Sequence, residues 1–496
     1  MTRAWRPWLV VLASAVLILA VIAAFGHPTV FTDTDDYQSL GHELALDAGL
    51  VAPPELSDAD IAQAKYDAHM GHTQMASRSA LYGVFLFGAE AAGTLWLVAG
   101  LQAAATAWVV ATLWRTALPG RRWWEPVAVI AGLALLTPLP FFAGFAMPDI
   151  FAAVAAIIAA LLLFYPDRIE RVERWGLAAL LVFALGVHTS HVLLAVALVA
   201  VGSVTLVVLR VDRRAIVRRI GLLVGLIAVA VAANGAYGIG IRLTTGERLR
   251  NQPFLTARLL ADGPGRDYLR HACAHETPYV LCRFKAKPLS DSEDVLWSDL
   301  PGTGVFMLST YATRVKLEDQ EGRFVVGTLA YAPVAQAVAS LKNWGRQLLL
   351  AYVDDPVRTP AFYLNDPYWR QTTLPPMIAR IEACGPRHDR CDSRLTVALS
   401  RRWHGALSII AAVVAFAALG VLAWRSRRAT PGPDRLVAAA VFLLLAVLIN
   451  AGVCGVLSGP FARYQARIVW LIPLVAAMLV VGGRRTDRFD SGSPHR

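Results

Sequence analysis

Long apolar runs separated by short polar loops dominate the chain. Ten runs approach the roughly 20 apolar residues that a helix needs to cross a bilayer core of about 30 Å. The fifth and sixth belong to one apolar stretch interrupted by the polar cluster GVHTSH, where we expect two helices to meet. The runs lie near residues 8–26, 92–114, 126–146, 148–165, 175–187, 189–209, 217–240, 404–424, 435–457 and 465–482. The pattern predicts an all-α polytopic membrane protein with about ten transmembrane helices.

Composition excludes several other classes of protein. Of the 496 residues, 56% are hydrophobic and 17% are charged, whereas a soluble domain carries about 25% charged residues. The high apolar fraction excludes a cytosolic multidomain enzyme and a disordered chain. Five cysteines in a chain of this length are too few for a disulfide scaffold.

Arginines predict the orientation of the helices. The net charge of +11 collects beside the apolar runs, a distribution typical of membrane orientation and not of nucleic-acid binding. The first run has no A-x-A cleavage site, so we expect a retained anchor. With both termini in the cytoplasm, every arginine-rich short loop lies inside, as expected for a multi-pass protein of the cell inner (plasma) membrane. These segments are residues 115–124, 166–174, 210–219, 425–435 and the tail RRTDR.

This orientation divides the chain into three parts. Residues 1–240 form an N-terminal membrane core whose first external loop, 27–80, is acidic. Residues 241–403 have no apparent spanning segment and are expected to form a mixed, mainly helical external (periplasmic) domain, with a helix broken near Pro333 and another at 374–384. Residues 404–496 supply the last transmembrane helices and a cytoplasmic tail.

Four cysteines lie in the expected external domain as two close pairs. Cys273 with Cys282 and Cys384 with Cys391 are predicted to form disulfides in an oxidising compartment. Zinc is the alternative because each segment contains a histidine, but neither pair has the spacing usual for structural zinc. The fifth cysteine, Cys454, is expected to be a small apolar packing residue.

Two external loops contain candidate carboxylates. The first loop reads HPTVFTDTDDYQSLGHEL and places Asp33, Asp35 and Asp36 close together, and FAMPDIFA places Asp149 after the third run. Crowded carboxylates suit a metal, a cationic partner or a reacting hydroxyl. The alternative is that these acids only cap helix N-termini.

Candidate phosphate-binding groups occur on the same side. His188 and His191 in HTSH face a cavity, or else join two helices by hydrogen bonds. Arg463 and Arg467 are four residues apart at the start of the last helix, where two guanidiniums can bind one phosphate. Snorkelling toward lipid phosphates explains one of these arginines better than both. Motifs for nucleotide, serine or zinc hydrolysis are absent from the sequence in the contexts that would confirm them.

The order of these features resembles the GT-C superfamily, whose members take sugar from a polyprenyl-phosphate donor outside the cytoplasm. The likeness comes from DTDDY in the first external loop, MPD after the third run, a late external domain and ARYQAR before the last run. The only WW pair, at 123–124, is on the expected cytoplasmic side, which argues against the oligosaccharyltransferase branch. The resemblance covers the membrane core and leaves 241–403 unplaced.

The resemblance implies a function and roles for residues. It implies transfer of a hexosyl or pentosyl group to a glycan, lipid or protein acceptor. Asp35 matches the catalytic carboxylate best, with Asp36 or Asp33 as alternates, and Asp149 matches the second acidic position. A divalent Mg or Mn ion would bind Asp35 and Asp149, if one is used. Two alternatives stay open: a transporter or flippase for a lipid-linked substrate, and a non-catalytic scaffold that displays the external domain.

Overall fold

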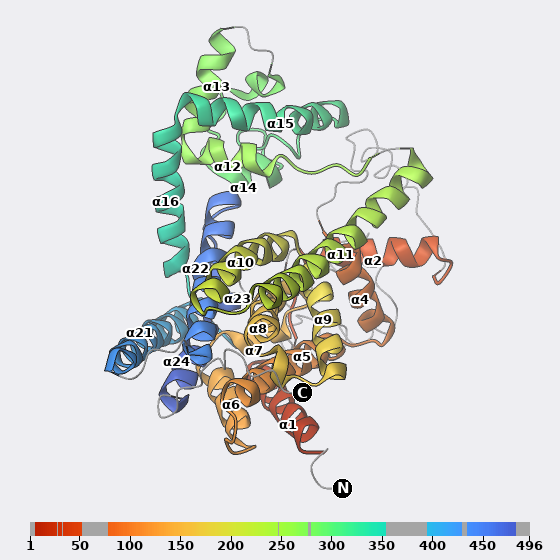
Figure 1. Ribbon diagram of the computed structural model, residues 1–496. Coiled ribbons are helices and arrows are strands. Elements are labelled where there is room, and N and C mark those ends of the chain that lie inside the picture. Colours follow the sequence, from red (N-terminus) through yellow and green to blue (C-terminus); the bar gives the residue numbers. More distant parts are fainter. Residues whose placement is uncertain are drawn as a thin grey trace.

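The computed structural model describes residues 5–26, 28–31, 33–51, 78–246, 248–275, 279–353, 394–428 and 434–482 (Figure 1). Side chains at a few helical positions within these ranges, Asp35 among them, are outside the description. In the described part the regular elements are all helices, joined at one point by an isolated bridge between Thr29 and Phe145. The expectation of an all-α protein is confirmed.

Seven helical segments are long and apolar enough to cross a membrane. Each has a run of 18 or more residues of high hydropathy with few charges. They are α1 (Trp5–Phe25), α5 (Trp96–Ala117), α10 (Thr189–Val208), α11 (Arg213–Thr245), the segment containing α21 (Ala406–Arg428), α22 (Arg435–Leu457), and α23 (Ala462–Val469) continued by α24 (Leu471–Gly482). Length and composition therefore support a multi-pass membrane protein.

Three of the ten apolar runs form shorter helices. The run at 126–146 is divided between α6 (Glu125–Leu136) and α7 (Leu139–Gly144), with Pro138 preceding α7. The runs at 148–165 and 175–187 become the turn η1 (Pro148–Ile150) followed by α8 (Phe151–Phe164), and α9 (Arg171–Gly186). Every residue of α8 is buried. A helix that is apolar on all sides belongs in a core as readily as in lipid, and α8 is enclosed by α5, α9, α10 and α22.

One break falls where the sequence predicts it. α15 (Tyr311–Tyr331) and α16 (Pro333–Leu349) are separated by Ala332 and bend by 104°. Pro333 at the first helical position suits the start of a new helix but lacks the N–H that would continue the old one. The two halves pass the length and hydropathy criteria together, which would give up to eight spans. The helix expected at 374–384 lies outside the described residues.

A second hydrophobic core lies apart from the membrane bundle. Its buried side chains come from residues 257–324, within α12 (Phe254–Asp262), α13 (Pro264–Ala274), η3 (Val280–Phe284), α14 (Ser292–Trp297), α15 and the loops between them. In Figure 1 these elements gather at the top of the molecule, while α16 descends from them beside α22.

The arginine-rich loops meet at one end of the bundle. Arg168 donates to the Thr116 carbonyl oxygen at 2.8 Å, and Arg115 pairs with Glu173 at 2.6 Å. Arg435, at the start of α22, pairs with Asp167 after α8 at 2.7 Å. Loops that are far apart in sequence therefore form one basic end, as the charge pattern requires.

Candidate functional site

Backbone bonds join the first loop to the loop before α8. The Thr29 N–H donates to the Gly144 carbonyl at 3.0 Å, and the Ala146 N–H donates to the Thr29 carbonyl at 2.8 Å. The Thr34 hydroxyl then donates to the Ala146 carbonyl at 3.1 Å. These bonds bring the start of α2 (Thr34–Asp47) beside Asp149, so two acidic loops far apart in sequence share one site.

Asp33 lies between two arginines. Its Oδ2 accepts hydrogen bonds from Nη1 and Nη2 of Arg463, both at 3.1 Å, and its Oδ1 pairs with Arg78 at 2.7 Å. Burial alone would raise the pKa of the Asp33 carboxyl, but the charges of Arg463 and Arg78 outweigh it and lower that pKa. Asp33 therefore stays ionised and holds both guanidiniums.

Asp149 forms a buried ion pair on the other side of the site. Its Oδ1 accepts from Nη1 of Arg467 at 3.1 Å, and the two side chains are 1% and 0% exposed. Nη2 of Arg467 also donates to Ser190 Oγ at 2.9 Å and to Asn450 Oδ1 at 3.0 Å. Burying a charge is tolerable only with a counter-charge and hydrogen bonds, and Arg467 has both.

Arg463 connects the two acidic loops. Its Nε lies 3.9 Å from Asp149 Oδ1 while its terminal nitrogens hold Asp33. The guanidinium carbon also lies 4.1 Å from the centre of the Phe31 ring, a cation–π distance. One cluster thus contains both predicted arginines and two predicted acids.

Asp33 and Asp149 both lie at the starts of helices, as the capping alternative expected, but their carboxylates bind arginines. Asp33 precedes α2, and Asp149 lies in η1 at the start of the α8 segment. Asp33 makes no capping hydrogen bond, and for Asp149 the Oδ1 accepts from Arg467 while the Oδ2 has no hydrogen-bond partner in the described part of the chain. Both carboxylates bind arginine instead, so capping does not account for them.

Asp35 and Asp36 are the other two acids of the first loop. Asp36 Oδ2 pairs with Arg78 Nε at 3.2 Å. Burial raises the pKa of Asp36, opposed by the charge of Arg78 and assisted by that of Asp33. Asp35 lies in α2, but its side chain is outside the description. Asp36 therefore holds a proton more readily than Asp33.

The two histidines lie next to the buried ion pair. His188 precedes α10, and its Nδ1 accepts from the Ser190 N–H at 3.2 Å. His191 is buried and bonds the Ala184 carbonyl through Nδ1 at 2.7 Å. A carbonyl only accepts, so Nδ1 carries the proton and Nε2 is an acceptor in the neutral ring. Among the described residues that Nε2 has no hydrogen-bond partner, nor have Asp149 Oδ2 and Arg467 Nε.

Sequence reasoning missed several members of this cluster. Arg78 is a single arginine two residues before α4 (Ala80–Ala91), and Asn450 is a single polar residue within an apolar span. A polar residue inside an apolar span is itself a signal of function or pairing. Cys454 is buried and free, as expected of a packing residue, but its Sγ lies 3.2 Å from Arg467 Nη2 and accepts a hydrogen bond.

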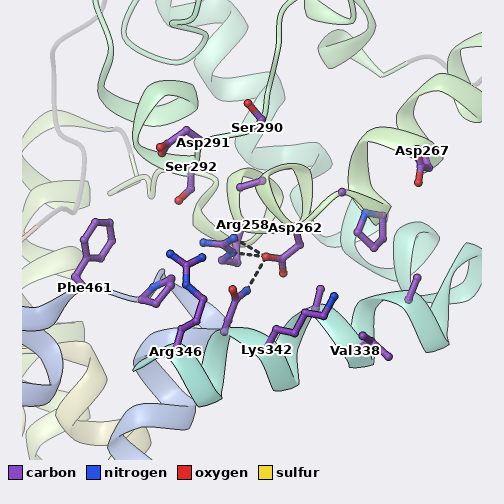
Figure 2. Close-up of a pocket in the computed structure, with 17 residues that line it drawn as sticks. Arg258, Asp262, Asp267, Ser290, Asp291, Ser292, Val338, Lys342, Arg346 and Phe461 are labelled. Atoms are coloured by element: carbon purple, nitrogen blue, oxygen red, sulfur yellow. Dashed lines mark hydrogen bonds and ion pairs between the residues drawn. The ribbon is translucent and has the colours of Figure 1, made fainter. Parts of the chain in front are cut away.

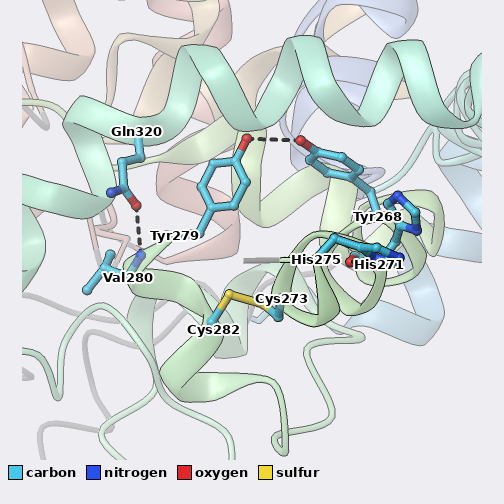
Figure 3. Close-up of a disulfide and its surroundings, with 8 residues drawn as sticks. All are labelled: Tyr268, His271, Cys273, His275, Tyr279, Val280, Cys282 and Gln320. Atoms are coloured by element: carbon cyan, nitrogen blue, oxygen red, sulfur yellow. Dashed lines mark hydrogen bonds between the residues drawn. A yellow bond between two sulfur atoms is a disulfide. The ribbon is translucent and has the colours of Figure 1, made fainter. Parts of the chain in front are cut away.

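One predicted disulfide is present and one lies outside the described residues. Cys273 on α13 is bonded to Cys282 in η3 (Figure 3). Nearby, the hydroxyls of Tyr268 and Tyr279 lie 3.0 Å apart, and the Val280 N–H donates to Gln320 Oε1 at 2.8 Å. The bond fastens η3 to α13 beside the second core. Cys384 and Cys391 fall in the undescribed segment.

A cavity of about 790 Å³ lies between the second core and α16 (Figure 2). Its lining includes Arg258 and Asp262 from α12, Lys342 and Arg346 from α16, and Phe461. Phe461 immediately precedes α23, which carries Arg463, so the cavity adjoins the charged cluster. Sequence reasoning gave no indication of this cavity.

Candidate metal ligands do not converge in the part of the chain that the structure describes. Within the described ranges no group of three or more His, Cys, Asp or Glu side chains is placed to hold a metal ion. The carboxylate pair proposed for a metal includes Asp35, whose side chain is not described.

No protein-family model, curated protein or solved structure matches this chain.

Proposed function

We propose that this chain is a GT-C-like integral membrane glycosyltransferase that moves a sugar from a polyprenyl-phosphate donor to a glycan, lipid or protein acceptor. The observation that carries the proposal is the convergence of Asp33, Asp149, Arg463 and Arg467 in one cluster. These residues come from three distant parts of the chain. Acids beside arginines are the groups that proton removal and phosphate binding require.

The proposal places the site on the external side of the inner membrane. The arginine-rich loops form the opposite end of the bundle, which the positive-inside rule assigns to the cytoplasm, together with both termini. α22 begins at that basic end with Arg435, and its Asn450 contacts Arg467 near the other end. The second core then lies outside.

The transfer step divides between two kinds of residue. The acceptor hydroxyl oxygen attacks the anomeric carbon of the sugar, and the bond from that carbon to the phosphate oxygen breaks. A first-loop carboxylate takes the hydroxyl proton, while the lipid phosphate leaves with the bonding electrons. General base catalysis contributes about 10²- to 10⁴-fold. Guanidiniums stabilise the charge that develops on the leaving phosphate.

Electrostatics separates the roles of the acids. Asp33 is held ionised between Arg463 and Arg78, so we assign it to positioning those guanidiniums. Asp35 or Asp36 supplies the base, and the raised pKa of Asp36 suits a proton acceptor. The contacts with Asp33 show that Arg463 and Arg78 can donate charge-assisted hydrogen bonds to an anionic oxygen. A phosphate oxygen accepts the same kind of hydrogen bond. We therefore assign Arg463 and Arg78 to the phosphate.

Arg467, Asp149 and the two histidines have a different role in this proposal. Arg467 is fully buried and its guanidinium bonds Asp149, Ser190, Asn450 and Cys454. It therefore positions α23, the helix that carries both arginines. His191 Nε2 has no hydrogen-bond partner among the described residues, so it can accept a hydrogen bond from a hydroxyl of a bound group.

The test replaces the first-loop acids one at a time. Asp33→Asn, Asp35→Asn and Asp36→Asn keep side-chain size but remove the negative charge. Asp47→Asn, an exposed position on the same helix, is the matched control. Membranes containing each variant are assayed for sugar transfer from a panel of polyprenyl-phosphate sugars. We expect Asp47→Asn to be active and Asp35→Asn or Asp36→Asn to lose at least about 100-fold.

The same measurements separate the alternatives. A cluster of ion pairs also suits a scaffold, because the described acids and arginines of this one are joined to each other. For a scaffold, the Asn variants would lower thermal stability without any transfer activity to lose. Full transfer activity in all three Asn variants would contradict the base assignment. Passage of an intact labelled lipid between leaflets, unaffected by the Asn variants, would favour a flippase.

A further inference from the structure

Helix α16 has its polar and apolar faces reversed. The side chains it buries are Gln336, Asn343 and Gln347. The side chains it exposes include large apolar ones, Val334, Val338, Leu341 and Leu349, which are between 46% and 79% exposed. A helix beside water buries its apolar stripe. The outward face of α16 is therefore built for an apolar environment.

Trp344 and the polar residue Gln347 bind α16 to α22 and to the start of α23. Trp344 Nε1 donates to the Leu448 carbonyl of α22 at 3.0 Å. Gln347 donates to the Phe461 carbonyl at 2.7 Å and accepts from the Phe461 N–H at 3.0 Å. Figure 1 shows α16 running beside α22. Since α22 is long enough to cross a membrane, the apolar face of α16 lies beside a candidate span, where lipid is the apolar environment that would suit it.

Two cations project from this helix at the edge of the cavity. Lys342 and Arg346 are four residues apart, one turn of helix, and both are exposed. Neither makes an ion pair with a residue in the described part of the chain. Figure 2 shows Arg346 reaching up from α16 toward Arg258 and the serines of the opposite wall.

The acids of the cavity have other partners. Asp262 binds Arg258 Nε at 3.0 Å, Gln336 at 2.7 Å and Asn343 at 2.7 Å. Asp267 pairs with Arg270 at 2.9 Å. Asp291 accepts the Glu293 N–H at 2.8 Å, at the start of α14. Asp291 keeps its negative charge, but no ion pair joins it to Lys342 or Arg346 in the described part of the chain, so both cations can bind a ligand.

We propose that this cavity binds the phosphate head group of an anionic membrane lipid, with Lys342 and Arg346 as its counter-charges. The acyl chains lie against the exposed apolar face of α16, which continues from the cavity along the membrane span. The hydroxyls of Ser290 and Ser292 line the opposite wall and can donate to a phosphate or a polar head group. A soluble phosphate compound would use the cations but would gain nothing from the apolar face. This site is separate from the proposed transfer chemistry and does not depend on it.

The test measures lipid binding to the full-length protein in a neutral detergent. Native mass spectrometry is used with phosphatidylglycerol, which is anionic, phosphatidylcholine, which is zwitterionic, and water-soluble glycerol phosphate. We expect preferential binding of phosphatidylglycerol. Lys342→Gln with Arg346→Gln should weaken it on the order of 30-fold, because each cation near a membrane surface contributes about 1 kcal/mol.

Matched variants give the proposal clear failing outcomes. Arg283→Gln with Lys285→Gln removes the same two charges from exposed positions outside the cavity and should change nothing. Lys342→Arg with Arg346→Lys should retain binding, which shows that loss in the Gln pair comes from charge. Leu341→Asn with Leu349→Asn should weaken the binding of phosphatidylglycerol and leave the binding of glycerol phosphate unchanged. Equal binding of glycerol phosphate and phosphatidylglycerol would make this a soluble-phosphate site and overturn the lipid assignment. Equal phosphatidylglycerol binding by wild type and the Gln pair would overturn the site.

Discussion

At the scale of residues, the cluster consists of ion pairs in which the loss of one partner is strongly destabilising. Arg467 and Asp149 are both buried, and each is the other's nearest opposite charge in the described chain. Removing one partner leaves an uncompensated charge away from water, whereas removing both leaves an apolar contact. The same logic applies less strongly to Asp167 and Arg435, because Asp167 is half exposed.

This difference predicts the outcome of paired substitutions. Asp149→Leu should lower the free energy of unfolding by about 3–5 kcal/mol. Adding Arg467→Met should restore most of the loss, while Asp167→Asn should cost less than about 1 kcal/mol. Denaturant unfolding in detergent, followed by tryptophan fluorescence, measures all three. Additive losses in the double variant would show that the pair is not coupled.

Titration of the first loop gives a second prediction. The pKa of Asp33 is lowered by the nearby guanidiniums despite burial, so its ionised form contributes stability above the ordinary carboxyl pKa of about 3.9. That contribution is lost as the pH falls through the lower, folded pKa. Asp36 has a raised pKa, so its contribution has the opposite sign: it is complete below the ordinary value and declines as the pH rises through the folded one. We expect the wild-type melting temperature to fall more steeply below about pH 4 than that of Asp33→Asn. Parallel slopes in a thermal scan from pH 3 to pH 7 would remove Asp33 as the cause.

Part of this site could be predicted from residue order alone. Asp149, Arg463 and Arg467 lie next to runs that end on the same side, so alternating topology brings them to one end of the bundle. Which acid meets which arginine depends on helix rotation and loop path, and apolar runs contain no such information. Arg78 and Asn450 were missed for that reason, and the catalytic choice among Asp33, Asp35 and Asp36 stays a prediction.

At the scale of elements, hydropathy predicted where helices form, and which of them cross a membrane stays a prediction. α8 is as apolar as a span, yet it is enclosed by other helices and is shorter than the spanning segments. Transfer from water favours lipid and protein interiors alike. α16 differs in the opposite way. Its sequence has the pattern of an ordinary amphipathic helix, but the Gln and Asn side chains are the buried ones and the apolar side chains face outward.

Close packing of α2 against α4 gives a prediction at this scale. Gly83 on α4 faces α2, where an added methyl group would lie 2.8 Å from the Tyr37 carbonyl oxygen and 3.0 Å from the Gly41 nitrogen. These are backbone atoms, so Gly83→Ala must push the helices apart and should destabilise the protein by about 1–3 kcal/mol. Gly88→Ala on the same helix meets nothing within 4 Å and should be neutral or stabilising by up to about 1 kcal/mol. Melting temperatures of the two variants measure the difference, and equal values would mean that this contact is not close in solution.

At the scale of the whole molecule, the charged cluster and the second core lie toward one end of the bundle and the arginine-rich loops toward the other. Glu293 of α14 illustrates the first relation. Its pKa is raised by partial loss of solvent and then by the charge of Asp33, the direction expected where the second core approaches the acidic loop. If the basic end faces the cytoplasm, the cluster, the cavity and the Cys273–Cys282 disulfide all face outward.

Orientation can be tested with reporter fusions that bracket single helices. Alkaline phosphatase, which is active only outside the cytoplasm, is fused after Arg210, Gly263 and Pro431. α11 lies between the first two positions and is long enough to cross a membrane, so they should lie on opposite sides. We expect activity at Gly263 and none at Arg210 or Pro431, because the latter two adjoin arginine-rich loops. A fluorescent protein that folds only in the cytoplasm should give the reverse pattern. Activity at both Arg210 and Gly263 would mean that α11 lies along the membrane surface, and activity at Arg210 alone would invert the protein and place the acidic cluster inside, away from an external sugar donor.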